Sequence, residues 1–227
     1  LPASRVHETS RRIASHRRRT PLVRSPWLSD LTGGPGHLRL ESLQLTGSFK
    51  LRGAVNAALA HQARVEAGSA APQLVTASAG NHGRGLAWAA HTLGLPLVVF
   101  TPRHAPAAKR DAIGRLGADL RNVADGYEDA ERLAKAYARE SGATYISPYN
   151  DPDVIAGAGT IALEILDDLP HVDRIVVPIG GGGLASGVGT VFEHLAPSVD
   201  VVGIEVEHSH AFTASLAAGR IVEVEVG

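Results

Sequence analysis

Residues 174–187 read Arg-Ile-Val-Val-Pro-Ile-Gly-Gly-Gly-Gly-Leu-Ala-Ser-Gly, and this stretch decides the fold class. Its apolar run at 174–177 is typical of a buried strand, and the apolar spacing from Leu184 to Leu195 is helical. Four consecutive glycines, Gly180, Gly181, Gly182 and Gly183, form the turn between them. Their bare amides lie at the start of a helix, where the helix dipole attracts an anion. The stretch therefore predicts a strand-turn-helix unit with a site for a phosphate group.

Two other interpretations of the glycine run are weaker. A flexible linker does not fit, because the glycines lie in a tight strand-to-helix junction without the serine-rich surroundings of such linkers. A dinucleotide site is suggested by a loose match to the pattern G-x-G-x-x-G, but Asp200 and Glu205 downstream give no persuasive ribose partner. The pattern favours a mononucleotide-sized ligand or a cofactor phosphate.

The same alternation of strand and helix patterns extends outward from this unit in both directions. It predicts an α/β fold with parallel sheets flanked by helices. The expected strands are 74–76, 97–100, 118–123, 144–146, 174–177 and 201–204, with a shorter one at 37–40 after the turn at 33–36. The expected helices are 54–67, 85–93, 107–116, 127–140, 154–169 and 184–195.

Turn-forming residues interrupt this alternation near the middle of the chain. Pro148 and the cluster Asn150-Asp151-Pro152 are typical of a crossing between domains. We predict a smaller domain at 70–148, inserted between the two parts of a larger domain at 1–69 and 149–227.

Composition limits the classes of function. The formal net charge is -1, from 22 basic and 23 acidic residues, which gives no broad reason to expect a nucleic-acid or membrane partner. The arginines at 11, 12, 17, 18 and 19 have no aromatic residue among them, so a solvated helical face is the better interpretation. The absence of cysteine excludes a disulfide or a thiolate site in this sequence.

Two further features concern location and length. The arginine-rich start lacks the apolar run of a signal peptide, and no later run approaches the roughly 18 residues of a membrane span. We therefore expect a soluble, cytoplasmic protein. Methionine is absent, including at position 1, so we expect the sequence to be part of a longer chain.

The segment 46–54, Thr-Gly-Ser-Phe-Lys-Leu-Arg-Gly-Ala, places Lys50 after a Gly-Ser turn at the start of a helix. A lysine that forms an imine must be partly desolvated or close to another cation, so that its amine is neutral. Most lysines at helix starts are simply solvated, so this motif is weak when taken alone.

A polar loop, 76–83, reads Thr-Ala-Ser-Ala-Gly-Asn-His-Gly between a strand and a helix. Its glycines allow close approach of a ligand, and Ser78, Asn81 and His82 add donors around an anion. The alternative is a plain N-cap turn, in which Asn81 or Ser78 caps the helix and His82 is exposed. That alternative leaves the other polar positions unexplained, so we favour a carboxylate site.

In combination and in this order, the motifs resemble the threonine/serine dehydratase family of fold type II (tryptophan synthase β-like) pyridoxal-phosphate enzymes. The resemblance extends over nearly the whole sequence, through residues 19–22, 47–54, 77–83, 154–164 and 177–184. It implies a two-domain α/β fold with the cofactor in the cleft. It also implies that the C-terminal part of the larger domain is missing from this sequence.

The resemblance assigns a role to each motif. Lys50 binds pyridoxal 5'-phosphate covalently and acts as the catalytic base, and Phe49 packs beside the cofactor. Asn81 bonds the phenolic oxygen of the cofactor. The cofactor phosphate is held by the backbone amides of Gly180, Gly181, Gly182, Gly183 and Leu184. The substrate carboxylate is held by Ser78, Ala79, Gly80, Asn81 and His82.

These roles imply α,β-elimination of water from L-threonine, L-serine or a similar hydroxy amino acid, giving a 2-oxo acid and ammonia. A serine racemase needs a serine as second base where this sequence has Ala79, so racemisation is the weaker interpretation. Other β-replacement enzymes of the fold, and a cofactor-binding sensor or scaffold without turnover, remain as alternatives. The resemblance also suggests a homodimer.

Some relatives bind a divalent cation through a carboxylate that matches Glu205 and a second one a few residues on, where this sequence has Ala211. Glu207, His208 and His210 lie nearby, but an exposed polar loop is the commoner explanation. We predict no metal site.

Overall fold

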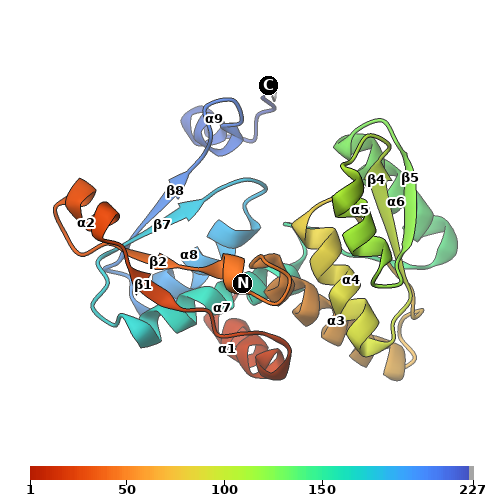
Figure 1. Cartoon of the computed structure of the whole chain (residues 1–227), viewed down its shortest axis with the longest axis horizontal. Helices are drawn as coiled ribbons and strands as arrows, with labels where there is room; N and C mark the ends of the chain where they lie inside the picture. The colour runs from red at the N-terminus through yellow and green to blue at the C-terminus, as the bar shows by residue number, and fades with distance from the viewer. Residues whose placement is uncertain (225–227) are drawn as a thin grey trace.

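The computed structural model describes residues 1–224 and contains two groups of elements joined through the long helix α3 (Figure 1). One group is built from the middle of the chain: β3 (Leu74–Ala77), α4 (Asn81–Leu93), β4 (Leu97–Pro102), α5 (Ala107–Gly114), β5 (Asp119–Ala124), α6 (Tyr127–Ser141) and β6 (Thr144–Tyr145). The other group combines the two ends of the chain.

The N-terminal part of that second group contributes α1 (Ala3–Arg12), η1 (Ala14–His16), β1 (Leu22–Arg24), α2 (Pro26–Thr32), β2 (His37–Arg39), η2 (Glu41–Leu43) and then α3 (Lys50–Glu66). The C-terminal part contributes α7 (Pro152–Asp168), β7 (Arg174–Pro178), α8 (Gly183–Leu195), β8 (Asp200–Ile204) and α9 (Ala211–Ala218). Among the described residues, no helix combines the length and the apolar character needed to cross a membrane.

The middle group is a four-stranded parallel sheet in the order β5-β4-β3-β6. Alternate residues of its central strands face opposite sides, as the pleat requires. Leu74 and Val99 pack on the side of α3, α4 and α5, whereas Val75 and Phe100 pack on the side of α6. Because both faces are covered, the central strands are continuous apolar runs.

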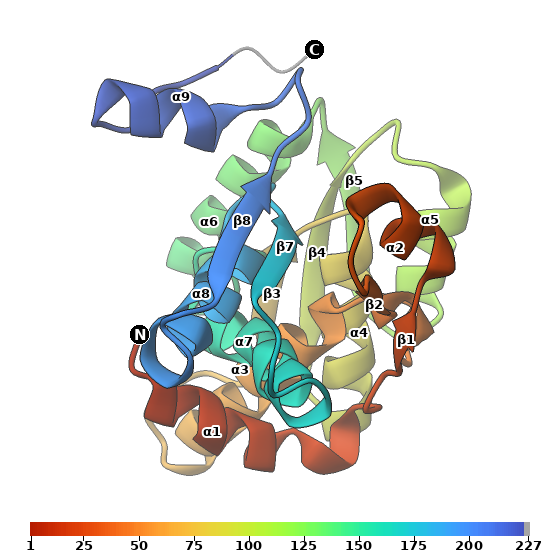
Figure 2. The ribbon, with the colours of Figure 1, turned by 90° about the vertical axis from the view of Figure 1, so that its left-hand side faces the viewer.

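The second group has a parallel pair, β7 and β8, connected by α8, and an antiparallel pair, β1 and β2. Its core lies between α1, α7 and α8, where Val6, Ile161 and Phe192 are buried. Figure 2 shows β7 and β8 side by side, with α9 beyond the end of β8.

Glycines allow α7 to approach both of its neighbouring helices. A Cβ atom on Gly157 would lie 2.4 Å from the Cα of Gly53 in α3. A Cβ atom on Gly187 in α8 would lie 2.6 Å from the backbone nitrogen of Gly159. No side chain fits at either crossing. Helix α7 therefore packs directly against both α3 and α8, and it fixes the distance between the start of α3 at Lys50 and the start of α8 in the glycine run.

The structure confirms the predicted α/β class and the predicted strands and helices, with shifts at their ends. The turn at 33–36 is also present, and Gly33 ends α2 with a φ of 71°. The sequence patterns did not predict α1, β1, α2 or α9. The division into domains at 70–148 stays a prediction.

The interpretation of the N-terminal arginines as a solvated helical face is wrong for three of them. Arg11 and Arg12 end α1, but Arg17, Arg18 and Arg19 follow it in extended or turn structure. The Arg17 side chain is only 12% exposed because it forms an ion pair with Glu164 of α7. Arg18 and Arg19 are exposed but not helical, whereas Arg17 is held against α7 by its charge pair.

Candidate active site

Lys50 is the first residue of α3, and its side chain points into the protein. The Nζ atom donates a hydrogen bond of 2.6 Å to the carbonyl oxygen of Pro148 and lies 5.2 Å from the centre of the Phe49 ring. Burial lowers the pKa of Lys50 from the ordinary lysine value. The structure therefore favours the neutral amine more than an exposed lysine does.

A small cavity brings Lys50 together with the end of the glycine run. It is lined by Phe49, Lys50, Gly53, Pro148, Val154, Ala158, Gly183 and Leu184. Two segments that lie far apart in the sequence thus meet at one cavity, whereas the polar loop 78–82 is not among the residues that line it.

The glycine run forms the entry to α8, and its shape depends on the absence of side chains. Gly182 is the N-cap residue and has a φ of 82°, in the left-handed region that favours glycine. A Cβ atom on Gly181 would lie 2.5 Å from the Cγ of Tyr149, whereas Gly180 has open space around it. Tyr149 and Phe212 fill the places that side chains at Gly181 and Gly182 would take, so Gly180 is the position of the run that faces open space. The start of α8 at this turn attracts an anion.

The polar loop at 78–82 connects β3 to α4. Ser78 is buried, and its Oγ accepts a hydrogen bond of 3.2 Å from the Gly80 amide. Gly80 is the N-cap residue of α4 and no side chain caps the helix. Asn81 is exposed in the first turn. The alternative of a plain N-cap turn is therefore wrong.

His82 is the most informative residue of this loop. It is 3% exposed, and neither ring nitrogen has a hydrogen-bond partner of good geometry among the described residues. Burial and the nearby charge of Lys50 lower the pKa of His82 to about 3, so the ring is neutral at physiological pH. An unpaired buried polar group costs about 1–3 kcal/mol, which a bound ligand would offset.

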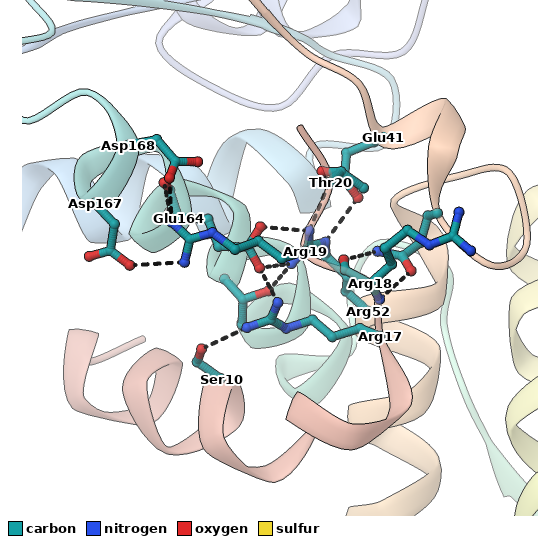
Figure 3. A network of polar contacts seen from close by, with 12 residues as sticks. Ser10, Arg17, Arg18, Arg19, Thr20, Glu41, Arg52, Glu164, Asp167 and Asp168 are labelled. Carbon is teal, nitrogen blue, oxygen red and sulfur yellow. Dashed lines mark hydrogen bonds and ion pairs between the residues drawn. The ribbon is translucent and has the colours of Figure 1, made fainter. Parts of the chain in front are cut away.

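A buried ionic network that the sequence analysis missed holds the start of α3 in place (Figure 3). The Arg52 guanidinium is fully buried and donates to both carboxylate oxygens of Glu41, at 2.8 and 2.9 Å, and of Glu164, at 2.8 and 3.0 Å. Arg17 and Arg39 also pair with Glu164. One sign of this network was present in the sequence, an arginine at position 52, two residues after Lys50 at the start of a predicted helix.

Two of the residues considered for a metal, Glu205 and His210, have other hydrogen-bond partners. The Glu205 carboxylate accepts hydrogen bonds from the backbone amides of Phe212 and Thr213, at 2.9 and 2.7 Å, and so caps α9. The His210 ring is hydrogen-bonded to the carbonyl oxygen of Glu207 at 2.8 Å. Across residues 1–224, no group of three or more potential ligands is placed to hold a metal ion.

These residues fit a phosphorylated cofactor that reacts with a lysine. Lys50 supplies a desolvated amine, the glycine run supplies bare amides, and His82 is a neutral polar group whose ring nitrogens have no hydrogen-bond partner of good geometry within residues 1–224. This arrangement defines an enzyme of the pyridoxal-phosphate class. The family model described as "Pyridoxal-phosphate dependent enzyme" matches residues 13–227, and the chain belongs to this family. The resemblance predicted from the sequence is thereby confirmed at the level of the family and its cofactor.

Individual relatives narrow the comparison. An L-threonine ammonia-lyase of Thermotoga maritima is 42% identical, over 97% of this chain and 54% of that protein. The solved threonine deaminase of T.th. is 36% identical with a TM-score of 0.89, over 99% of this chain and 71% of that one. Maize serine racemase is 33% identical with a TM-score of 0.91, over 99% of this chain and 67% of that one. The chain thus spans about half the length of the Thermotoga relative.

Proposed function

We propose that this chain carries the cofactor site of a pyridoxal-phosphate-dependent dehydratase, or ammonia-lyase. Its substrate would be L-threonine, L-serine or a similar hydroxy amino acid. The observation that carries the proposal is the buried Lys50 amine, which shares a cavity with Gly183 and Leu184. The names of the Thermotoga and T.th. relatives, L-threonine ammonia-lyase and threonine deaminase, support the reaction class.

In this proposal the glycine run binds the cofactor and the polar loop 78–82 binds the substrate. The backbone amides of residues 180–184 hold the cofactor phosphate, Phe49 packs beside the ring, and Asn81 bonds its phenolic oxygen. Residues 78–82 hold the substrate carboxylate. The neutral His82 ring can donate one hydrogen bond to that carboxylate, which would satisfy a ring nitrogen that has no partner among the described residues.

When bound, pyridoxal phosphate supplies an electron sink for the charge that develops at the substrate α-carbon. Lys50 would hold the cofactor covalently, and its neutral amine, once replaced by the substrate amine, would take the α-proton. The Lys50 ammonium would return that proton to the β-hydroxyl, which would leave as water. One water would then hydrolyse the remaining carbon–nitrogen bond, so the net products would be a 2-oxo acid and ammonia.

Racemisation is the second candidate, because the solved maize relative is a serine racemase. Ala79 argues against it: its methyl group, half-buried between Ser78 and Gly80, cannot deliver a proton to the opposite face of the substrate. Incubation with L-serine and L-threonine, followed by chiral analysis of the remaining amino acid and assay of ammonia and 2-oxo acid, separates the two reactions. The same assay detects β-replacement when a nucleophile is added.

The lysine assignment has a direct test. Purified protein mixed with pyridoxal phosphate should develop a visible absorption band, and borohydride should then fix the cofactor to Lys50, as found by peptide mass spectrometry. A Lys50→Ala protein should lose the band, the covalent link and the formation of 2-oxo acid. A Lys50→Ala protein that kept the band and the activity would refute the proposal, whereas cofactor binding without turnover in the wild type would favour a sensor or scaffold.

Three features of organisation belong to the same proposal. We expect a smaller domain at 70–148 that faces the cofactor site, a homodimer, and a cytoplasmic location. The first is supported by the four-stranded sheet, which takes all its strands from residues 74–145. The family likeness supports the other two.

A further inference from the structure

Tyr149 lies against the glycine run, although no sequence motif singled it out. Its ring fills the space beside Gly181, where a Cβ atom would lie 2.5 Å from the ring Cγ. Its carbonyl oxygen lies close to Gly183, at 2.9 Å from the place of a Cβ atom. The residue before it is Pro148, whose carbonyl oxygen accepts the hydrogen bond from Lys50. Two consecutive residues thus contact the two parts of the proposed cofactor site: Pro148 contacts Lys50, and Tyr149 contacts the glycine run.

The other end of Tyr149 reaches the middle group of elements. Its hydroxyl donates its single proton to the Glu131 carboxylate in α6, whose two oxygens lie at 3.4 and 3.5 Å. Glu131 also accepts a hydrogen bond of 3.1 Å from the Tyr145 hydroxyl and pairs with Lys135 at 3.0 Å. Burial raises the pKa of Tyr149, so the phenol remains a hydrogen-bond donor at neutral pH.

We propose that Tyr149 is a positioning residue for the cofactor phosphate, and that Glu131 fixes the orientation of its ring. The ring supports the outer side of the glycine run, so it sets the path along which the amides of 180–184 face an anion. The contact with Glu131 ties that path to α6, and hence to the group of elements that carries Ser78 and His82. This inference rests on the proposed cofactor site, but it requires no particular reaction.

A purely structural role would lower stability without selectivity for the phosphate. A positioning role predicts that substitution of Tyr149 weakens the binding of pyridoxal 5'-phosphate. The binding of pyridoxal, which lacks the phosphate, should be unchanged. The measurement is the dissociation constant of each compound by absorption titration of the purified protein. A thermal melt of each variant shows that it is folded.

For Tyr149→Ala we expect the dissociation constant of pyridoxal 5'-phosphate to rise about tenfold and that of pyridoxal to change less than twofold. Tyr137→Phe is the matched control, because Tyr137 is a phenol of α6 that donates to Gln73 at 2.7 Å, away from the glycine run. It should leave both constants unchanged. Equal loss for the two compounds in folded Tyr149→Ala protein would overturn the proposal.

A double-mutant cycle tests the part played by Glu131. Tyr149→Phe and Glu131→Ala break the same contact, so each should weaken pyridoxal 5'-phosphate binding about threefold, and the double variant should be no weaker than either one. Lys135→Ala is the control for Glu131, since it removes a partner of the carboxylate without touching Tyr149. Additive losses in the cycle would refute the link. Wild-type protein that binds the cofactor but forms no 2-oxo acid would refute the proposed reaction and leave this test intact.

Discussion

The Lys50 amine donates a 2.6 Å hydrogen bond to the carbonyl oxygen of Pro148, across a distance of 98 positions in the sequence. A backbone carbonyl accepts from either protonation state of an amine and adds no negative charge to hold the proton. Burial, which disfavours the charged form, therefore dominates and lowers the pKa of Lys50 below 10.5. The same contact fixes the amine at the edge of the cavity that includes Gly183.

This pKa direction predicts how the amine reacts as the pH changes. Because only the neutral amine reacts with an acylating reagent, labelling of Lys50 should rise with pH around a midpoint below 10.5, the ordinary lysine value. Competitive labelling of protein freed of cofactor, read out by peptide mass spectrometry, measures each lysine in the same sample. Lys109, which is exposed in α5, is the internal control. Coincident midpoints for Lys50 and Lys109 would contradict the prediction.

The buried His82 ring predicts a pH dependence of stability. Its pKa is about 3 in the folded protein, against the ordinary histidine value of 6.5 in the unfolded chain, so the unfolded chain binds more protons between these limits. The free energy of unfolding should therefore fall as the pH is lowered through this window, by about 1.4 kcal/mol per pH unit from this group. Above pH 6.5 the contribution is constant.

The comparison is between the wild type and a His82→Leu protein, in urea unfolding at several pH values between about 6 and 4. The wild type should lose stability more steeply, because the variant has no ring to protonate. His91→Leu is the matched control: His91 lies on the same helix but is exposed. Parallel pH profiles for the wild type and His82→Leu would show that His82 binds a proton as readily in the folded protein as in the unfolded chain, and would contradict the prediction.

Much of the middle group could be predicted because its central strands, β3 and β4, are buried on both faces. A strand such as β4 must then be a continuous apolar run, which the sequence shows directly. The bounds of α1 were not predicted because only three of its residues, Ala3, Val6 and Thr9, are buried, and no apolar run marks it. The glycine run was evident because four successive glycines have few structural uses.

The contacts between distant segments were beyond the sequence patterns. Nothing local to Tyr149 indicates that its ring meets Gly181, since that contact depends on how the segment after β6 passes the start of α8. The burial of His82 was missed in the same way, because the loop sequence alone is compatible with an exposed ring. Periodicity predicts which residues face the core, but it does not predict which loops meet.

The helix crossing at Gly157 predicts a steric limit on the site. Alanine there would place a Cβ atom 2.4 Å from the Cα of Gly53, and neither backbone can yield without moving α3 from α7. Overpacking of this kind costs about 1–3 kcal/mol. Gly189→Ala in α8 is the matched control, because open space surrounds that position and alanine favours a helix by roughly 0.5–1 kcal/mol. Urea unfolding should give opposite signs for the two variants, and equal effects would contradict the close crossing.

The Arg52 network predicts a large loss of stability when the guanidinium is removed. Replacing Arg52 by methionine keeps most of the side-chain length but leaves the Glu41 carboxylate without its two guanidinium hydrogen bonds. Loss of one partner of a buried pair costs about 3–5 kcal/mol, because the remaining charge stays desolvated. Arg174→Ala should cost less than about 1 kcal/mol, since Arg174 pairs with Asp200 at the surface, where the two side chains are 65% and 55% exposed.

Lysine at position 52 separates the role of charge from that of geometry. It retains the positive charge but cannot donate two parallel hydrogen bonds to each of two carboxylates, so Arg52→Lys should fall between the wild type and Arg52→Met. Urea unfolding at low and high salt completes the measurement. The Arg52 effect should persist at high salt because the pair is buried, whereas the Arg174 effect should shrink. If Arg52→Lys were as stable as the wild type, charge alone would hold the start of α3, and the paired geometry of Arg52 would have no role.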